Sequence, residues 1–304
     1  MEKSAKSKNN KGVTKFKITQ SLIKNLRDYQ EGKGECGLQI EAKYIRGEWN
    51  KFEPTDVMRL GTWFEYKLTR AIPKNGEVPQ PVTKRDGNLT APYERMLKHV
   101  DNFKKLQTIL GFKILDNDVT WSWEDLAGTL DLLCESTKDI IQDGIIIVKK
   151  GQKFIADIKS TGLLDDKWND YGWNLNNLGN KTKIITQPIH YKYLGKQLYG
   201  EDMPFLFFLF HSNQEYDFRV INFVVDEDVY DDHLEWVSWT RTWMNHYVKE
   251  GFTAHIDTQE GKIYPSVKKC AECPLKVGCK GFRVIPTIDT FHHHLANIDD
   301  KYNY

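Results

Sequence analysis

Short apolar runs separated by polar turns occupy the middle of the chain, and they predict β-strands. These runs are rich in Ile, Val, Leu and Trp and cover 119–124, 126–135, 144–148 and 154–159. Two later runs, 205–211 and 218–225, predict a strand pair joined by a turn near Asn213. Residues 205–210 are apolar without interruption, which is typical of a strand that is buried in a core.

Apolar positions at helical spacing predict helices on both sides of these strands. Thr19 suits the cap of a first helix that runs through Leu26, and Asp226 suits the cap of a last helix that ends by Gly251. The other helices are expected over 55–69, 93–110 and 185–199. Met58, Phe64 and Leu68 are the candidates for the apolar face of the helix over 55–69.

Turn and loop residues mark the connections. Residues 72–92 contain four prolines and predict a loop, and Lys150, Gly151 and Gln152 predict a hairpin turn. Residues 162–183 are polar and aromatic and predict a long loop, of the kind that is usually functional or disordered. Its aromatic residues between Trp168 and Trp173 could stack on bases or pack against protein.

The order of elements predicts a mixed α/β (α+β) fold, with a central mixed sheet flanked by helices. We expect one folded domain over 18–285 between a basic, disordered tail and a polar C-terminal tail. Its expected parts are a helical N-terminal part over 18–112, a core over 113–251 and a cysteine segment over 262–285; the tails cover 1–17 and 286–304.

Composition narrows the class of protein only slightly. The 43 basic and 42 acidic residues give a net charge of +1, which neither favours nor excludes nucleic-acid binding. No apolar run approaches the ~20 residues of a membrane span, and the lysine-rich N-terminus lacks the apolar core of a secretory signal. A cytoplasmic location is therefore expected. The lysines of the tail favour disorder over weak attraction to DNA.

Acidic residues stand at the ends of two predicted strands. Asp131 closes the stretch Gly128-Thr129-Leu130-Asp131, and Asp157-Ile158-Lys159 closes a later strand. Because side chains two apart on a strand share a face, Asp157 and Lys159 point the same way and Ile158 points into the core. Two neighbouring carboxylates predict a site for Mg²⁺ or Mn²⁺, with the lysine beside an attacking water. The alternative is a structural ion pair at a sheet edge.

A third stretch lies on the predicted helix over 185–199. Gln187 and Tyr191 are four residues apart and share a helix face with Leu194 and Leu198. Taken alone, this pair could equally be a capping glutamine and a core tyrosine.

In this order the three stretches resemble the PD-(D/E)XK nucleases, and among them the RecB-type exonuclease group, over roughly residues 19–282. The resemblance implies a restriction-endonuclease-like core in which Asp131, Asp157 and the carbonyl of Ile158 bind metal. It implies that Lys159 is the catalytic lysine. Gln187 and Tyr191 would hold the DNA backbone and the lysine near the site.

The resemblance extends to an earlier helix. The segment Gly61-Thr62-Trp63-Phe64-Glu65 matches one in the group, with Glu65 where many relatives carry His. Glu65 would be a third acid that ligates metal directly or through water; the alternative is a solvated helix glutamate. The gap from Asp131 to Asp157 is longer than is usual in the group, which implies an inserted loop around 136–143.

Three of the five cysteines form the compact pattern Cys270-x2-Cys273-x5-Cys279, which in a cytoplasmic protein indicates metal binding. The fourth ligand is Cys36 or Cys134, and Cys134 is expected to be an ordinary core residue. One cysteine before the core and three after it resemble the AddB-like and CRISPR-adaptation-type iron–sulfur nucleases. That resemblance implies a structural [4Fe-4S] cluster on Cys36, Cys270, Cys273 and Cys279, although four thiolates also suit Zn²⁺. The later His292-His293-His294 run is interpreted as solvated.

These observations together predict a metal-dependent DNA exonuclease that acts on single strands or duplex ends. The chain has no Gly-x4-Gly-Lys-Ser/Thr loop, so a helicase or recombination partner would supply any unwinding. Repair, recombination, CRISPR adaptation and phage DNA processing are the settings that the resemblance offers. The alternatives are a structure-specific or restriction-like endonuclease and a non-catalytic nucleic-acid-binding or assembly protein.

Overall fold

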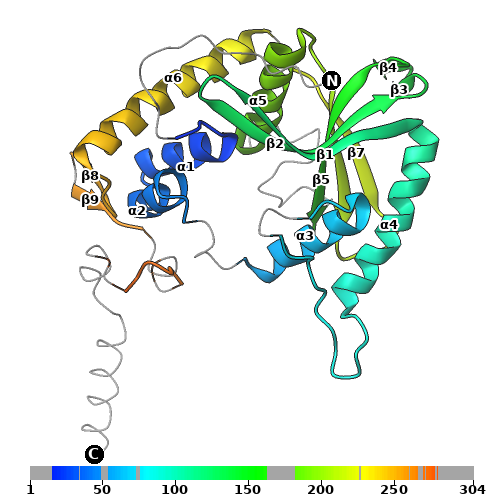
Figure 1. Ribbon diagram of the computed structural model, residues 1–304, viewed down its shortest axis with the longest axis horizontal. Helices are drawn as coiled ribbons and strands as arrows, with labels where there is room; N and C mark the ends of the chain where they lie inside the picture. Colours follow the sequence, from blue (N-terminus) through cyan, green and yellow to red (C-terminus); the bar gives the residue numbers. More distant parts are fainter. Residues whose placement is uncertain are drawn as a thin grey trace, which may run out of the picture. The chain divides into compact units, whose positions relative to one another are not determined.

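The structure is a computed structural model in which the chain forms two compact units (Figure 1). Unit 1 comprises residues 1–24 and 53–241, and unit 2 comprises residues 25–52 and 242–304. The structure describes residues 16–33, 35–48, 54–72, 76–162, 182–225, 227–259, 261–265, 270, 272–277 and 279. Unit 2 is therefore built from two segments that lie before and after the longer segment of unit 1 in the sequence.

A five-stranded mixed sheet organises unit 1, with the strand order β1-β2-β5-β6-β7. The strands are β1 (Phe112–Trp123), β2 (Leu126–Ser136), β5 (Lys153–Thr161), β6 (Phe205–His211) and β7 (Phe218–Phe223). β5 and β6 are parallel, and the other neighbours are antiparallel. The crossover between the parallel strands contains helix α5 (Thr182–Tyr199), as such a connection requires. The predicted mixed α+β fold with a central sheet is confirmed.

The two faces of the sheet carry different layers. Leu206, Phe208 and Phe210 of β6 belong to one buried cluster with residues of helices α3 (Asp56–Thr69) and α4 (Ala91–Leu110). Phe205 faces the other way, with its ring 6.4 Å from that of Tyr191 on α5. Every residue of β6 is buried, because helices cover it on both faces.

The cap predicted at Thr19 is present, Asp226 lies outside the described residues, and Thr55 is a cap that was not predicted. Thr19 Oγ1 accepts a hydrogen bond from Leu22 N at the start of α1 (Gln20–Gln30). Thr55 Oγ1 accepts one from Met58 N at the start of α3. Met58 itself is 60% exposed, so its predicted place on the apolar face of α3 is wrong; Leu60 and Trp63 are buried instead. Leu198 is likewise partly exposed on α5.

The insertion between the two acidic strands is a hairpin, in place of the predicted loop over 136–143. Strands β3 (Ile140–Gln142) and β4 (Ile145–Val148) pair antiparallel around Asp143 and Gly144, which both have positive φ. Gly151 forms a turn, with its N–H donated to the Ser136 carbonyl, but it does not join two paired strands. The hairpin predicted at 150–152 is therefore wrong, because β4 pairs with β3 and β5 pairs with β2.

Unit 2 contains helix α2 (Gly37–Ile40), the π-helical turn η1 (Glu41–Ile45) and the strand pair β8 (Ile256–Thr258) and β9 (Gly261–Ile263). Helix α6 (Glu227–Glu250) begins in unit 1 and ends in unit 2. Tyr29 joins the two chain segments of unit 2, since its hydroxyl donates to the His255 carbonyl at 2.7 Å. The Thr253 carbonyl approaches Gly37 so closely that no Cβ fits between them.

Some predictions fall at the edges of the described chain. Phe16, inside the predicted tail, is buried, and Ile18 forms a bridge with Leu126, so the described chain is packed from residue 16. Residues 1–15, the aromatic loop at 168–173 and the histidine run at 292–294 lie outside the described residues. The domain predicted over 18–285 stays a prediction, although the two units divide the chain at other points.

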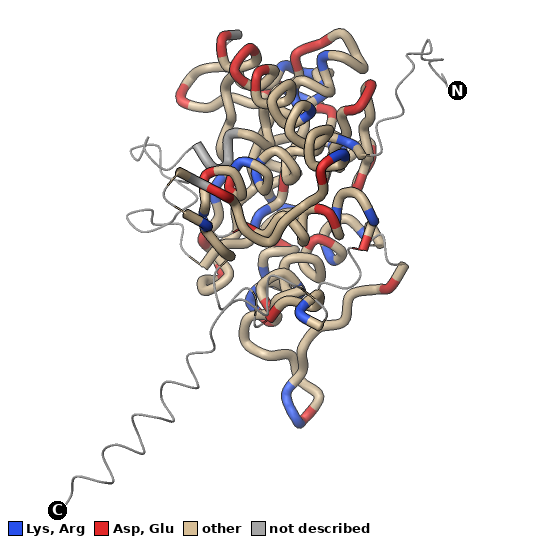
Figure 2. The backbone as a smooth tube through the Cα atoms, turned by 90° about the vertical axis from the view of Figure 1, so that its left-hand side faces the viewer, with Lys and Arg blue, Asp and Glu red and all other residues tan. Residues whose placement is uncertain are grey.

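Lys and Arg residues are interspersed with Asp and Glu residues along the described backbone (Figure 2). Of the helices that the structure describes, none is both long and apolar enough to cross a membrane.

A pair of buried histidines links α5 to α6 and β2 within unit 1. His190 Nε2 lies 3.0 Å from the Ala127 carbonyl, so this nitrogen must carry the proton and donate it. His190 Nδ1 lies 3.2 Å from His233 Nε2, which must therefore donate to it. Burial lowers the pKa of His190 to about 4 and that of His233 to about 3. Both rings are thus neutral at pH 7.

This pair predicts a loss of stability in acid. Below pH ~6.5 the histidines of the unfolded chain bind protons while the folded pair stays neutral until about pH 4, so stability falls as pH drops through that window. The expected slope is ~1.4 kcal/mol per pH unit for each histidine. We expect His233→Gln, which keeps a donor toward His190, to make the slope between pH 6.5 and 4.5 shallower by one proton in urea unfolding. An unchanged slope would show that the pair is not the source.

Candidate active site

The first feature of the site is a fork in the sheet between β2 and β5. The two strands pair only from Leu132–Ala156 to Glu135–Lys153. Beyond Ala156, β5 pairs with β6 alone, up to Thr161 and His211. Continuing the register would set Asp131 opposite Asp157, so both acids stand where the strands separate. A gap between two diverging strands gives side chains access to backbone groups that a continuous ladder would occupy.

Asp131 closes the fork with its side chain. Its Oδ2 accepts a hydrogen bond of 2.8 Å from Ile158 N, in the place of a strand neighbour. Since the N–H and C=O of one strand residue point to the same edge, the Ile158 carbonyl is directed toward the fork as well. The Ile158 side chain is buried in the core cluster, as predicted.

Asp157 lies at the centre of this site and is 1% exposed. Its Oδ1 accepts a hydrogen bond of 2.6 Å from Gln187 Nε2 on α5. Its Oδ2 is buried and forms an ion pair with Lys159 Nζ. One carboxylate oxygen is thus fixed by an amide, and the other lies against the lysine ammonium.

The electrostatics show an excess of negative charge. Burial, followed by the charge of Asp131, raises the pKa of Asp157 to about 7. Burial and Asp131 likewise raise the pKa of Glu65 to about 8, with Asp157 adding to the effect. Burial alone would lower the pKa of Lys159, but the carboxylates of Asp157 and Asp131 together raise it. A single lysine does not neutralise three acids, which is the situation that a bound cation relieves.

Tyr191 packs one helical turn after Gln187, against the strand that carries Asp131. Its ring is 4% exposed, and burial followed by the charges of Asp157 and Asp131 raises the pKa of its hydroxyl. A Cβ on Gly128 would lie 2.5 Å from Tyr191 Cε1 and 3.2 Å from Leu194 Cδ1. Gly128 is therefore required because α5 approaches β2 too closely for any side chain.

This contact predicts opposite effects at two glycines of unit 1. Gly128→Ala should destabilise the fold by ~1–3 kcal/mol, because it overpacks a buried ring. Gly61→Ala on α3 should be neutral or stabilising by up to ~1 kcal/mol, since its Cβ would meet only Ser160 Oγ, 3.8 Å away. Urea unfolding of the two variants measures the difference. Equal effects would mean that the Tyr191 ring can move aside.

The open end of β5 is held by the turn over 211–215. Ser212 N donates to the Thr161 carbonyl at 2.7 Å, and Asn213 Nδ2 donates to the Gly162 carbonyl at 3.1 Å. Helix α4 binds the other side of this turn: Arg95 Nε donates to the Ser212 carbonyl at 2.8 Å, and His99 Nε2 donates to the His211 carbonyl at 2.9 Å. No sequence-based prediction included this support. The helical spacing of Arg95 and His99 is a signal that could have indicated it.

The cysteines fall into two environments. Cys134 belongs to the core of unit 1, as predicted, whereas Cys36, Cys270, Cys273 and Cys279 all belong to unit 2. Burial raises the pKa of Cys36 to about 11, although the N–H groups of Gln39 and Leu38 partly offset this effect. The charges of Cys279 and Cys273 also act on Cys36, so the two chain segments bring these sulfurs near one another.

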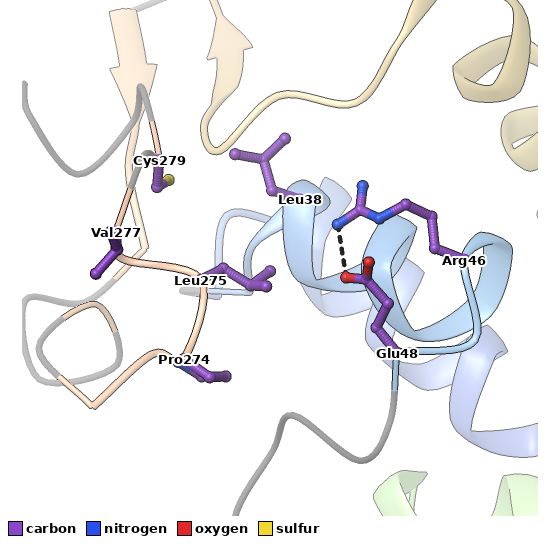
Figure 3. A pocket seen from close by; sticks show the side chains of 7 residues that line it. All are labelled: Leu38, Arg46, Glu48, Pro274, Leu275, Val277 and Cys279. Atoms are coloured by element: carbon purple, nitrogen blue, oxygen red, sulfur yellow. Dashed lines mark hydrogen bonds and ion pairs between the residues drawn. The ribbon is translucent and has the colours of Figure 1, made fainter.

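A hollow of about 450 Å³ lies beside this cysteine group in unit 2 (Figure 3). Pro274, Leu275, Val277 and Cys279 form one wall, and Leu38 with the Arg46–Glu48 ion pair forms the other. Gln39 Nε2 lies 3.2 Å from Cys273 Sγ. N–H donors thus lie beside two of the sulfurs, those of Cys36 and Cys273.

Within the described part of the chain, no three His, Cys, Asp or Glu side chains are close enough together to ligate a metal ion. The donor chemistry nevertheless fits two kinds of group. The oxygens of Glu65, Asp131 and Asp157 with the Ile158 carbonyl suit a hard divalent cation. The four thiols of unit 2 suit a cluster or zinc.

No protein-family model matches the chain, and no curated protein matches it. One solved structure that matches this chain is the crystal structure of a “putative exonuclease” from Eubacterium rectale. The two chains are 17% identical with a TM-score of 0.50, and the match covers 77% of this chain and 81% of the other. At this identity the likeness concerns the fold alone.

Proposed function

We propose that this protein is a metal-dependent nuclease of the PD-(D/E)XK type that hydrolyses phosphodiester bonds in DNA. The observation that carries the proposal is the fork between β2 and β5. It gathers Asp131, Asp157, Lys159 and the Ile158 carbonyl at one point, where burial and Asp131 raise the pKa of Asp157 to about 7 although Lys159 is beside it. A structural ion pair needs one acid and one lysine, and the excess of acids has no role in it.

Each side chain has a separate part in the proposed chemistry. Asp131, Asp157 and the Ile158 carbonyl would hold a Mg²⁺ or Mn²⁺ ion, and Glu65 would join them directly or through water. When bound, such an ion polarises a phosphoryl oxygen and assists ionisation of water. Lys159 would orient the attacking water and stabilise charge that develops on the phosphate. Gln187 would keep the Asp157 carboxylate in a fixed rotamer, and Tyr191 would hold the strand backbone nearby.

The kind of nuclease that we propose is an exonuclease. It would act on single strands or duplex ends, in repair, recombination or phage DNA processing. The name of the Eubacterium rectale protein supports exonuclease activity as the first choice. The structure-specific or restriction-like endonuclease is the second candidate. A helicase or recombination partner would supply any unwinding.

For unit 2 we propose a [4Fe-4S] cluster on Cys36, Cys270, Cys273 and Cys279, with Zn²⁺ as the alternative. These thiols come from both segments of the unit, so a shared metal group would fasten the segments together. The role is structural, since hydrolysis transfers no electrons. Support for the proposal is the common environment of the four cysteines and the separation of Cys134 from them.

The deciding experiment uses protein purified without oxygen and end-labelled DNA, as linear and as closed circular single strands. With Mn²⁺ or Mg²⁺, linear DNA should be degraded from its ends and circles should persist. EDTA should stop the reaction. Cleavage of circles would favour the endonuclease, and binding without cleavage of either substrate would favour the non-catalytic alternative.

A further inference from the structure

The connection between α3 and α4 is an ordered hairpin that leaves the body of unit 1. We call residues 76–90 the arm; Figure 1 shows it extending beyond the ends of both helices. Thr83 forms a bridge with Leu89, and Lys84 N donates to the Asn88 carbonyl at 2.7 Å. The tip is closed by Asp86, whose carboxylate accepts hydrogen bonds from Asn88 N and Nδ2. The arm therefore has a defined shape.

This ordered segment contributes little to the core. Only Pro79, Pro81, Leu89 and Thr90 are partly buried, and Val78 and Val82 are 41% and 45% exposed. The base alone is anchored: Leu89 packs against the core cluster, and Tyr93 stacks edge-on to Trp63 with ring centroids 5.0 Å apart. A hairpin that is ordered, exposed and apolar in part has surface available for a partner.

Charge at the tip indicates what kind of partner fits. Lys84 and Arg85 are adjacent, and Figure 2 shows Lys and Arg at the end of the extended loop. Lys84 Nζ forms an ion pair with Glu94 Oε1 at 3.2 Å. The Asp86 carboxylate accepts a hydrogen bond from Asn88 Nδ2. Arg85 has no partner among the described residues. An exposed guanidinium on a rigid support is a group that binds phosphate oxygens.

The arm connects two helices that contribute to the candidate active site and its support. Helix α3 carries Glu65, and Arg95 of α4 donates to the Ser212 carbonyl in the turn that holds the open end of β5.

We propose that the arm binds the phosphate backbone of the DNA whose end enters the active site, with Arg85 and Lys84 on phosphates and the exposed valines against sugars. This inference rests on the proposed nuclease function and names the part of the chain that grips the substrate away from the reacting bond. It assigns the arm to duplex next to the end, because the tip lies well outside the fork.

The test measures DNA binding in a background that cannot cleave, Asp157→Asn, with a fluorescent duplex that carries a single-stranded end. Lys84→Ala/Arg85→Ala should weaken binding at least fivefold. It should also make the slope of log K against log salt shallower by about one to two units, at ~0.9 per lost phosphate contact. The matched control is Lys104→Ala/Lys105→Ala, which removes two exposed charges from α4 and should bind as the parent does.

The possible outcomes separate the two proposals. Unchanged affinity and slope in the arm variant, with a parent that binds and a wild type that cleaves, would overturn the arm inference alone. A wild type that neither binds nor cleaves DNA would overturn both. Equal weakening in the arm variant and the control would also overturn the inference, since the effect would then be one of total charge. If the double variant does not fold, the same DNA-binding measurement is made with Arg85→Ala alone.

Discussion

Asp157→Asn is expected to reduce DNA cleavage by at least ~10³-fold, because the loss of a metal ligand removes several kcal/mol of transition-state stabilisation. The fold should survive the change. Burial and Asp131 raise the pKa of Asp157 to about 7, so its ionised form is unfavourable in the folded protein. An amide carries no charge and can still bind Gln187. We therefore expect the melting temperature without added metal to stay the same or to rise.

A second measurement distinguishes a loss of catalysis from a loss of folding. Mn²⁺ should raise the melting temperature of the wild type, because a ligand that binds only the folded state stabilises it. That rise should be absent in Asp157→Asn and present in Asp101→Asn, whose acid is exposed on α4. An Asp157→Asn protein that cleaves at the wild-type rate would remove the nuclease assignment.

Cys36→Ser is expected to abolish iron binding and to cause a large loss of thermal stability. Protein purified without oxygen should be brown, with broad absorption near ~400 nm and about four irons per chain. Cys36 is 6% exposed and belongs to a different segment from Cys270, Cys273 and Cys279, so its loss would leave three ligands on one segment. Removal of a structural metal from a small unit commonly unfolds that unit.

The control is Cys134→Ala, in the core of unit 1, which should keep its iron. A colourless protein with one zinc per chain would show that the metal group is Zn²⁺ and not an iron–sulfur cluster. The proposed linkage of the two segments would then still hold. Iron that is lost with Cys134→Ala and kept with Cys36→Ser would show that the fourth ligand was misassigned.

The sequence predicted those features that depend only on residue type and on the local geometry of a helix or strand. Thr19 marks the start of α1 because its hydroxyl caps the helix, and the apolar run over 205–210 marks a central strand. The shared face of Asp157 and Lys159 follows from strand geometry alone. The exposure of Met58 could not be predicted in this way, because it depends on which part of α3 packs against the sheet.

Long-range features of the site were beyond the sequence. The hydrogen bond from Ile158 N to Asp131 exists because two strands diverge, and nothing in either strand alone specifies that divergence. Gly128 is needed because the Tyr191 ring leaves no room for a Cβ, and this contact between β2 and α5 cannot be read from either segment alone. Strand β4 was predicted over 144–148, but its partner β3 was taken as part of a loop over 136–143 because it is only three residues long.

The division of the chain into units has a consequence for synthesis. Unit 2 consists of residues 25–52 and 242–304, so all of unit 1 after residue 52 leaves the ribosome before the second half of unit 2. Domains commonly fold in the order in which they emerge. Cys36 is therefore translated more than two hundred residues before Cys270, the first cysteine of the second segment. During that interval the nascent chain would present one half of a unit whose buried surfaces, including those around Tyr29 and Gly37, have nothing yet to cover them.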